Sequence, residues 1–502
     1  MKIKFIATSD VHGYPCPYQY SNQKLVNQGL SRLAQFIRTN NDENCVLIDN
    51  GDILQGSPLS YHHHLFLEDQ INPMALCLNE LKYDYFNIGN HDFNYHQDVL
   101  IKFLNDIDAK CITGNITGNK NLEYQYDIKT VNGYKLAFIG ATNDYIPNWE
   151  IPNHIIGLQF EDSYEYVKRT IEYIKNNEKV DFTVVVYHGG FECLFDGQKL
   201  ETPCLDNCGY KMLENLDIDL FITGHQHRSI CEFVHNTFVV QTASNAQELA
   251  YVELDPISKT FSGKLVKAEF DIDQKIIDLV KDEEAMTQIW LDQPIGTLKD
   301  CDCLISDDID ARINKHRCVS FLNQVQASHY KSDLSAMALF NNPAGFRKEI
   351  TMRDVVSTYV YPNTLVNYEV NGLQLKKYLE NAVAYFDIID DEIGVSKIYC
   401  EPKPIHYEYD MVDGIEYTIK VSNPVGSRII EIKKDGKIVN DDDLFSMVVN
   451  NYRSAGGGNY NILKECKIID NDGKEMVEII AEYIMKNSPV EIIHHSNIKL
   501  IK

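Results

Sequence analysis

Five short apolar runs in the first half of the chain are each followed at once by side chains that can bind a metal. The runs are rich in β-branched and aromatic residues, which is typical of buried strands. Because ligands of an open α/β sheet bind outside the carboxyl ends of its strands, we expect the polar residues after these runs to meet at one place. Those residues are Asp10 and His12, Asp52, Asn90, His188, and His225 with His227.

Each fragment taken alone has a simpler interpretation. Short motifs arise by chance, and a buried Asp or His is more often a hydrogen-bonded core residue than a metal ligand. The ordered set is more specific, because D-x-H, G-D, G-N-H-D, a strand-end histidine and G-H-x-H each stand just after an apolar run. Two carboxylates, four imidazoles and one amide in one place indicate a site for two metal ions.

The length and charge of the chain limit its architecture and partners. With 502 residues it is too long for a single core and should form at least two domains. The net charge of −26 argues against binding to a nucleic-acid polymer. No apolar run reaches the roughly 18 residues of a membrane span, so no membrane partner is expected. The oligomeric state is not predicted.

The predicted compartment is the cytoplasm. The first strand begins at Ile3, which leaves no room for a signal peptide ahead of it. Thirteen cysteines, an odd number, fit a reducing compartment better than a disulfide framework. An exported protein is the alternative if the chain is a trimmed mature form.

The pattern along the chain predicts two domains joined by a helix. Residues 1 to about 270 alternate strand-like and helix-like stretches, with helical spacing over 28–39 and 162–176, which predicts an α/β domain. A helix capped by Asp273 and ended by Pro294 follows; one more helix of the first domain is the alternative. We place the domains at 1–272 and 295–502, with the connecting helix at 273–294. The second domain, with a helix expected over 376–386, is also α/β or α+β. The three histidines at 62–64 are expected in a surface loop or at a helix start.

The ordered motifs of the first half resemble those of the calcineurin-like metallophosphoesterases. The resemblance implies a four-layer β-sandwich domain flanked by helices, in which Asp52 bridges two divalent metal ions. The other ligands would be divided between the ions, with Asp10, His12 and His227 on one and Asn90, His188 and His225 on the other. Such ligands suit Zn, Mn, Fe or Co and disfavour Ca. A hydroxide bridging the ions would attack phosphorus.

The second half resembles the C-terminal domain of the 5′-nucleotidase family. The resemblance is carried by Y-P-N-T-L at 361–365, V-N-G at 370–372, D-M-V-D-G-I-E-Y at 410–417 and N-N-Y-R-S-A-G-G-G at 450–458. It implies that Tyr361 and Tyr460 hold a nucleobase between their rings, although core packing is the alternative for any single Tyr. Arg347 is expected to contact phosphate or ribose, and Asn341 is a weaker candidate.

The residues after Asn90 indicate which branch of the family the chain resembles. His91 is expected to stabilise the transition state or to protonate the leaving oxygen; the alternative is that it only orients Asn90. Asp92 stands where Glu is usual and is expected to orient its neighbours. Many 5′-nucleotidases pair the motif histidine with an Asp where this chain has Asn94. The Asn, like the motifs of the second half, is typical of the 2′,3′-cyclic-nucleotide 2′-phosphodiesterase/3′-nucleotidase branch.

The predicted function is metal-dependent hydrolysis of nucleotide phosphoesters. The expected course runs from 2′,3′-cyclic nucleotides to 3′-nucleotides and then nucleosides. A 5′-nucleotidase or nucleotide-sugar hydrolase is the alternative. A metal-dependent nuclease would need a basic groove, which the charge of −26 disfavours. A non-enzymatic binding protein would normally have lost some of the ligands.

Overall fold

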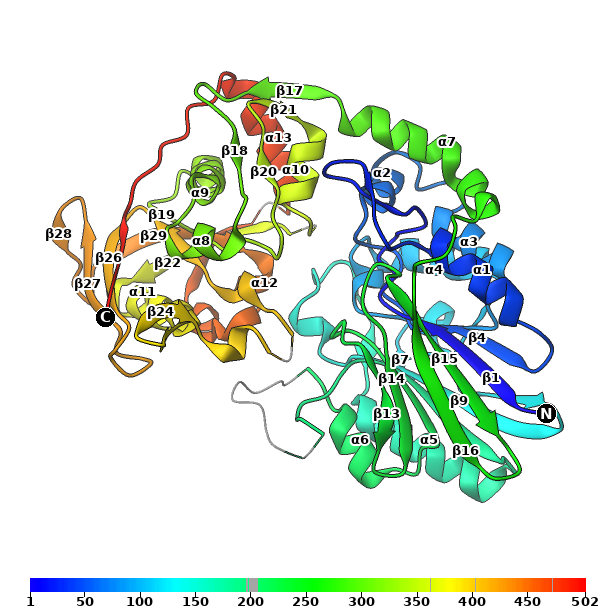
Figure 1. Cartoon of the computed structure of the whole chain (residues 1–502). Helices are drawn as coiled ribbons and strands as arrows, with labels where there is room; N and C mark the ends of the chain where they lie inside the picture. The colour runs from blue at the N-terminus through cyan, green and yellow to red at the C-terminus, as the bar shows by residue number, and fades with distance from the viewer. Residues whose placement is uncertain (196, 198–205, 362, 402, 472) are drawn as a thin grey trace. The chain divides into compact units, whose positions relative to one another are not determined.

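The computed structural model divides into two compact units, Met1–Thr287 and Gln288–Lys502 (Figure 1). It describes residues 1–195, 197, 206–361, 363–401, 403–471 and 473–502. The division falls inside helix α7 (Gln274–Leu291). Asp273 caps this helix, because its Oδ1 atom accepts hydrogen bonds from the backbone N–H groups of Lys275 and Ile276 at 3.0 and 3.2 Å. Among the described residues, no helix is both long enough and apolar enough to cross a bilayer.

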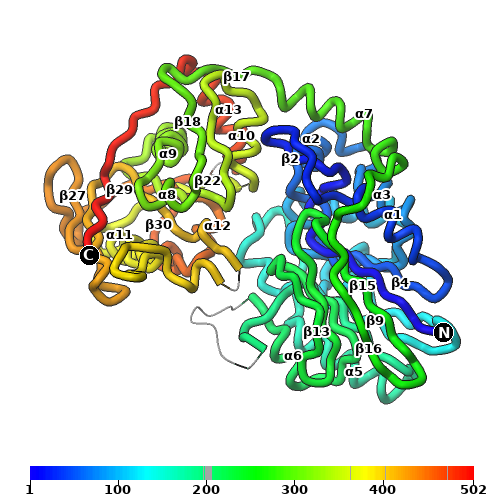
Figure 2. The backbone as a smooth tube through the Cα atoms, in the orientation of Figure 1, coloured from blue at the N-terminus to red at the C-terminus, as the bar shows by residue number. Residues whose placement is uncertain are grey.

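The N-terminal unit contains two six-stranded mixed sheets (Figure 2). The first sheet has the order β16 (Thr260–Lys267), β15 (Glu248–Asp255), β1 (Ile3–Thr8), β4 (Cys45–Asp49), β5 (Tyr85–Phe86) and β6 (Lys110–Cys111). The second has the order β13 (Ile230–Val234), β14 (Thr237–Gln241), β12 (Leu220–Thr223), β11 (Phe182–His188), β9 (Tyr134–Thr142) and β8 (Asp127–Val131). Strands β1, β4, β5 and β6 are parallel, as are β9, β11, β12 and β14.

The two sheets pack face to face over one apolar core. Phe138 of β9 lies against Phe5 of β1 and Tyr85 of β5, with ring centroids 6.4 and 4.6 Å apart. Alternate residues of β1 and β11 point into this core, as the period of two in a strand requires. Burial of these side chains is the main stabilising contribution to the unit.

Helices cover the outer faces of both sheets. On the first sheet, α1 (Leu30–Asn40) packs through Phe36 on Tyr251, and α4 (Gln97–Asp106) through Phe103 on Phe86, each pair with centroids 5.4 Å apart. On the second, α5 (Ser163–Asn177) and α6 (Gly209–Asn215) pack on β9, β11 and β12 through one buried cluster. Helix, sheet, sheet and helix make four layers, which confirms the predicted α/β sandwich.

The histidines at 62–64 differ from the prediction of a surface loop or a helix start. They lie within helix α2 (Pro58–Phe66), where His62 and His63 are buried. His63 Nδ1 is 2.9 Å from Glu283 Oε1 of α7, and His64 stacks on Tyr95 with centroids 4.2 Å apart. The burial depends on contacts with residues far away in the sequence, such as Glu283, so the local pattern did not predict it.

The C-terminal unit is a second α/β structure. Its five-stranded sheet has the order β25 (Met411–Asp413), β19 (Leu334–Met337), β29 (Leu444–Asn450), β22 (Leu365–Asn371) and β30 (Lys467–Asp470). A four-stranded sheet has the order β28 (Lys437–Ile438), β27 (Ile429–Lys434), β26 (Glu416–Lys420) and β31 (Ile498–Ile501). Its longer helices are α9 (Arg317–Tyr330), α11 (Gly372–Ala382) and α13 (Met476–Asn487).

Helix α11 begins four residues before the predicted 376. Asn371 and Gln374 form a reciprocal capping box, in which each side chain accepts a hydrogen bond from the backbone N–H of the other, at 2.9 and 2.8 Å. This cap sets the start of the helix, whereas the apolar pattern used for the prediction begins only inside it.

Candidate metal centre

Seven polar residues follow the carboxyl ends of five strands in the N-terminal unit. They come from two different sheets: β1, β4 and β5 belong to the first, and β11 and β12 to the second. Because each set of strands is parallel, their carboxyl ends reach the same edge of the sandwich. The two sheets thus bring together side chains that are up to 217 residues apart in the sequence, Asp10 and His227.

The backbone is unusual at five of these residues. Their φ angles lie in the left-handed region, which non-glycine residues rarely adopt and which carries strain. Such strain is maintained where the surrounding structure holds a side chain in a required direction. The residues are Asp10 (56°), His12 (51°), Asp52 (56°), His225 (66°) and His227 (53°).

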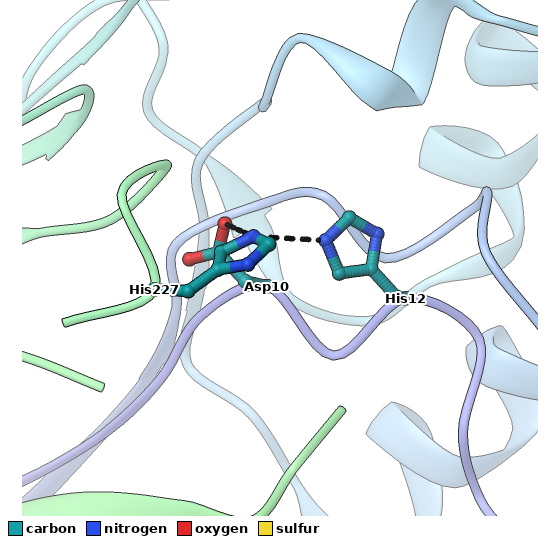
Figure 3. Close-up of side chains that lie close together, drawn as sticks. All are labelled: Asp10, His12 and His227. Atoms are coloured by element: carbon teal, nitrogen blue, oxygen red, sulfur yellow. Dashed lines mark hydrogen bonds and ion pairs between the residues drawn. The ribbon is translucent and has the colours of Figure 1, made fainter. Parts of the chain in front are cut away.

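The first group of possible ligands is Asp10, His12 and His227 (Figure 3). The Nε2 atom of His227 lies 3.2 Å from Asp10 Oδ1 and 3.2 Å from His12 Nε2. One ligand atom from each residue lies within 4.8 Å of those of the other two. The group is the same as the one predicted from the resemblance for the first ion.

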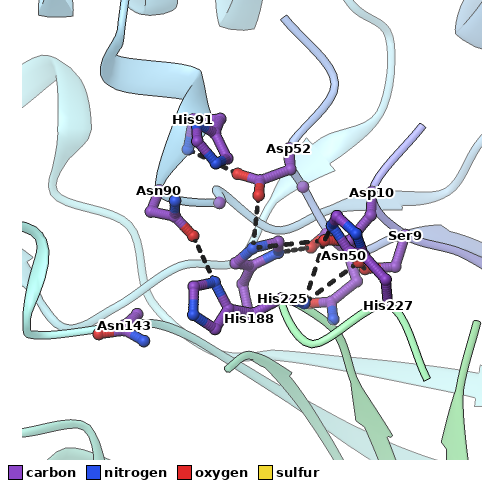
Figure 4. A network of polar contacts seen from close by, with 12 residues as sticks. Ser9, Asp10, Asn50, Asp52, Asn90, His91, Asn143, His188, His225 and His227 are labelled. Carbon is purple, nitrogen blue, oxygen red and sulfur yellow. Dashed lines mark hydrogen bonds and ion pairs between the residues drawn. The ribbon is translucent and has the colours of Figure 1, made fainter. Parts of the chain in front are cut away.

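The second group contains Asp52, His188 and His225, with Asn90 beside them (Figure 4). His188 Nε2 lies 3.1 Å from Asp52 Oδ2, and His225 Nδ1 lies 2.8 Å from Asn90 Oδ1. The two groups adjoin, because His188 Nε2 is also 4.0 Å from Asp10 Oδ1.

Contacts at the far side of three imidazoles fix which nitrogen faces the site. His12 Nδ1 and His188 Nδ1 lie 2.8 and 2.5 Å from the backbone oxygens of Gln55 and Asn50. The Nδ1 atoms therefore carry the proton and donate it, which leaves the Nε2 lone pairs available. His225 has the reverse arrangement, since its Nε2 atom lies 3.1 Å from Asp206 Oδ2 and its Nδ1 atom faces Asn90.

The donor set fits divalent metal ions. The buried Asp52 Oδ2 and His188 Nε2 atoms face each other at 3.1 Å. Burial lowers the pKa of His188, but the Asp52 carboxylate outweighs this effect and raises it to about 10, so a bound cation would take the place of this proton. Burial lowers the pKa of His12, so its ring is neutral and can bind a metal near pH 7. Burial raises the pKa of Asp10, but the neighbouring His227 outweighs this effect. The pKa of Asp10 therefore lies below the ordinary range.

His91 lies next to the first group, with its ring centroid 5.5 Å from that of His12. Its backbone N–H donates to Asp52 Oδ1 at 2.6 Å, and its Nδ1 atom lies 2.7 Å from Asn94 Oδ1. The structure therefore brings His91 and Asn94 together, and Figure 4 shows His91 beside Asp52.

Asp92 contacts the loop that carries Asp52. Its carboxylate accepts four backbone N–H groups at 2.8 to 3.0 Å, those of Asp52, Ile53, Leu54 and Gly89. A Cβ atom on Gly89 would lie 2.3 Å from Asp52 Oδ1, so only glycine allows this approach of the two loops. These contacts hold the Asp52 loop in place.

The predicted base-binding residues have different environments in the C-terminal unit. Tyr361 is half-buried, with its ring 5.0 Å from that of Phe340; Pro362 of the same motif lies outside the described residues. Arg347 binds Asp354 through two hydrogen bonds of 2.8 and 3.2 Å. Asn341 donates to the backbone oxygen of Pro404 at 2.9 Å, and its Oδ1 atom is buried without a partner.

The structure places Tyr460, the second residue expected to stack on a nucleobase, in the core, which is the alternative given for any single Tyr. Tyr460 is fully buried, and its hydroxyl donates to the backbone oxygen of Glu408 at 2.9 Å. Its ring is 4.4 Å from the ring of Tyr378 and 4.5 Å from the guanidinium of Arg453. These two neighbours pack against the Tyr460 ring.

Three residues beside the site were not predicted. Asp206 contacts His225, Trp149 stacks on the same ring at 5.4 Å, and Glu150 contacts Asn94. None stands at the end of an apolar run, so the pattern used to find the other residues does not detect them. Asn50 does belong to the D-N-G-D motif, but it acts on His188 through its backbone oxygen, which its residue type does not reveal.

Comparison with known proteins agrees with this geometry. A model of the calcineurin-like phosphoesterases matches residues 3–229, and a model of the 5′-nucleotidase C-terminal domain matches residues 294–465. The structure is similar to that of a Staphylococcus aureus protein assigned as a 5′-nucleotidase and solved with α-ketoglutarate, with a TM-score of 0.92, 32% identity and coverage of 100% of both chains.

Two curated proteins are also similar. The 2′,3′-cyclic-nucleotide 2′-phosphodiesterase/3′-nucleotidase of Haemophilus influenzae is 26% identical over 97% of this chain and 85% of its own length. The trifunctional nucleotide phosphoesterase protein YfkN of Bacillus subtilis is 25% identical over 97% of this chain, which spans only 38% of YfkN.

The predicted cytoplasmic location is wrong. The chain is similar over its whole length to the 5′-nucleotidase precursor of Thermus thermophilus, with a TM-score of 0.71 and 19% identity. A precursor is a chain from which a segment is later removed, as happens on export, so the mature form of such a protein begins without a leader. The position of the first strand and the number of cysteines therefore do not indicate the compartment.

Proposed function

Because the chain belongs to the calcineurin-like metallophosphoesterases and carries the C-terminal domain of the 5′-nucleotidases, we propose that it hydrolyses nucleotide phosphoesters with two divalent metal ions. The observation that carries this proposal is the pair of adjoining ligand groups around Asp10 and Asp52. The burial of Asp52 Oδ2 and His188 Nε2, which face each other at 3.1 Å, supports it. The proposed phosphoesterase domain is 1–272, the connecting helix is 273–294, and the nucleotide-binding domain is 295–502.

The proposed ligands divide as the two groups do. Asp10, His12 and His227 would hold one ion, and Asn90, His188 and His225 the other, with Asp52 shared. Zn, Mn, Fe and Co suit these nitrogen and oxygen donors. When bound, such ions supply Lewis-acid activation of water and neutralise charge at phosphorus.

His91 is the proposed proton donor or charge-stabilising group. It lies beside the ligands, but the resemblance assigns it to no ion, and Asn94 holds its Nδ1 atom. The Nε2 atom would then contact a phosphate oxygen or the leaving oxygen. Asp92 would act by keeping the Asp52 loop in position.

The proposed preferred substrates are 2′,3′-cyclic and 3′-nucleotides. Support comes from Asn94, from the motifs of the second half and from the similarity to the Haemophilus influenzae enzyme. Tyr361 remains the proposed stacking partner of the base, with Arg347 and Asn341 as candidate ribose or phosphate contacts. The second candidate is a 5′-nucleotidase, which is favoured by the 32% identity to the Staphylococcus aureus protein.

A side-by-side assay of three adenosine phosphates tests the order of preference. Protein loaded with Mn²⁺, Co²⁺ or Zn²⁺ would be given 2′,3′-cyclic AMP, 3′-AMP and 5′-AMP. We expect kcat/KM to be higher for the first two, with the cyclic diester opened by loss of its 2′-oxygen to give a 3′-monophosphate. A higher kcat/KM for 5′-AMP than for both others would establish the second candidate, and turnover of none of them would refute the proposed function.

A further inference from the structure

A chain of hydrogen bonds leads from His91 to a buried carboxylate that lies outside every motif. Asn94 Oδ1 lies 2.7 Å from His91 Nδ1, and Asn94 Nδ2 donates to Glu150 Oε2 at 2.7 Å. Glu150 is 56 residues from Asn94 in the sequence and follows the short 3₁₀ helix Ile146–Asn148. Its side chain is only 4% exposed. A carboxylate is rarely buried unless its hydrogen bonds serve a purpose.

The Glu150 carboxylate is held from both sides. Its Oε1 atom accepts the backbone N–H of Ile151 at 2.8 Å and lies 2.9 Å from His154 Nδ1. The preceding residue, Trp149, stacks on the ring of His225 with an interplanar angle of 16°. Two successive residues thus contact the surroundings of His91 and a proposed metal ligand.

The carboxylate decides which way the Asn94 amide points. The two ends of an amide have nearly the same shape, so its hydrogen-bond partners determine its orientation. An ionised carboxylate only accepts hydrogen bonds, so the NH₂ end of Asn94 must face Glu150. The oxygen end then faces His91, and the ring must carry a proton on Nδ1 to donate to it.

We propose that Glu150 is a positioning residue for His91: through the Asn94 amide it keeps the Nδ1 proton in place and the Nε2 atom directed to the reacting phosphate. This inference rests on the proposed function, in which His91 acts on the phosphoester. An amide has no charge of its own to orient His91. In this arrangement the charge comes from Glu150, which acts on His91 through the Asn94 amide.

Exchanging the amide of Asn94 and the carboxylate of Glu150 tests this chain of hydrogen bonds. In Glu150→Gln, the remaining oxygen is needed by the Ile151 N–H, so the NH₂ group faces Asn94 and turns its amide round. We expect kcat to fall about 10- to 100-fold, as for other lost orienting contacts, with KM nearly unchanged. Asn94→Asp alone places two carboxylates together and should also be impaired. The double variant Asn94→Asp/Glu150→Gln restores the order of donors and acceptors and should recover most of kcat.

Two further measurements separate positioning from folding and from the proposed function. Glu172→Gln, on the exposed side of α5, should leave kcat unchanged. The ¹⁵N signals of His91 in histidine-labelled protein should show a protonated Nδ1 in the wild type and a change in Glu150→Gln, whether or not the protein turns over substrate. Wild-type kcat or an unchanged His91 signal in Glu150→Gln would overturn the proposal. If the His91 signal changes in Glu150→Gln but the wild-type protein has no phosphoesterase activity, the positioning role is supported and the proposed function is refuted.

Discussion

At the scale of single residues, the carboxylates of Asp52 and Asp92 have different tasks. Asp52 accepts the backbone N–H of His91 with its Oδ1 atom, and its Oδ2 atom faces His188 Nε2 of the candidate site. Asp92 uses both oxygens on backbone N–H groups of the loop. One carboxylate is thus available to a ligand, and the other is committed to the fold.

Substitution of Asp52 and of His91 should separate metal binding from chemistry. Asp52→Ala should remove both ions and abolish turnover, because the proposed bridging ligand is lost. His91→Ala should retain the metals and lower kcat by roughly 10² to 10⁴, the range for a lost acid or charge-stabilising group. Elemental analysis of the purified variants and their steady-state kinetics measure both. Full activity of metal-free Asp52→Ala protein would refute the two-metal proposal.

Asp92→Ala should destabilise the N-terminal unit and weaken metal binding together. It leaves four backbone N–H groups of a buried loop without an acceptor, and breaking such a network costs on the order of 3–5 kcal/mol. Urea unfolding and metal titration measure the two effects. The exposed Asp98 is the matched control, since Asp98→Ala should change the free energy of unfolding by less than about 1 kcal/mol. Equal effects of the two substitutions would contradict the role given to Asp92.

At the scale of elements, polar contacts between helices and strands matter as much as apolar packing. Helix α2 has buried histidines, of which His63 contacts Glu283 of α7. In the C-terminal unit, Asp410 precedes β25 and Arg453 belongs to α12 (Asn451–Ser454), and the two form a buried pair with two contacts of 2.9 Å. This pair joins the segments 410–417 and 450–458 in the fold.

The stability of the N-terminal unit should depend on the titration of His64. Burial, with smaller effects of His154 and His63, lowers its pKa from 6.5 to about 4. The unfolded chain therefore binds a proton below pH 6.5 that the folded chain does not bind until about pH 4. The contribution is fully present above pH 6.5 and is lost as the pH falls towards 4.

His64→Phe isolates this effect, because Phe keeps the stacking on Tyr95 and does not titrate. Between pH 6.5 and 4, the free energy of unfolding should fall less steeply in the variant than in the wild type, by about 2 kcal/mol over the window. Urea denaturation at several pH values measures the difference. Parallel curves for the two proteins would show that His64 titrates normally.

Asp410→Asn should destabilise the C-terminal unit strongly. The guanidinium of Arg453, 2% exposed, would stay buried without a counter-charge, which costs about 3–5 kcal/mol. The proposed metal ligands all lie in the other unit, so the metal content should not change. Thermal unfolding together with elemental analysis checks both parts. An unshifted unfolding transition would show that the pair contributes little.

At the scale of the whole molecule, the proposed metal ligands and the base-binding candidates are in different units. All seven ligands lie within Met1–Thr287, whereas Tyr361, Arg347 and Asn341 lie within Gln288–Lys502. Each unit has its own sheets and its own core. Metal binding is therefore expected to change the unfolding of the N-terminal unit and not that of the C-terminal unit.

Removal of the metals should act on one unit. Chelation with EDTA should abolish phosphoesterase activity and lower the unfolding temperature of the N-terminal unit, because a ligand bound only to the folded state stabilises it by about 2.7 kcal/mol at 100 times its Kd. The transition of the C-terminal unit should not move, and added Mn²⁺ should restore both activity and stability. Calorimetry resolves the two transitions; equal shifts of both would contradict separate stabilisation.

The sequence by itself determined the strands, the layered α/β class and the residue types at the candidate metal centre. Each of these depends on local chemistry: an apolar run forms a buried strand, and the polar residue after it, such as Asp10 or His188, must stand at the strand's carboxyl end. Helix starts were less exact where a cap lies outside the apolar pattern, as at Asn371.

Only the tertiary structure decided which residues far apart in the sequence meet. It placed Tyr460 in the core beside Arg453, buried His62 and His63, and brought Glu150 to Asn94 and Asp206 to His225. No local pattern predicts these contacts, because burial and hydrogen-bond partners depend on how several elements pack together. The sequence therefore indicated the chemistry of the candidate site, and the packing of two sheets decided how its side chains are held.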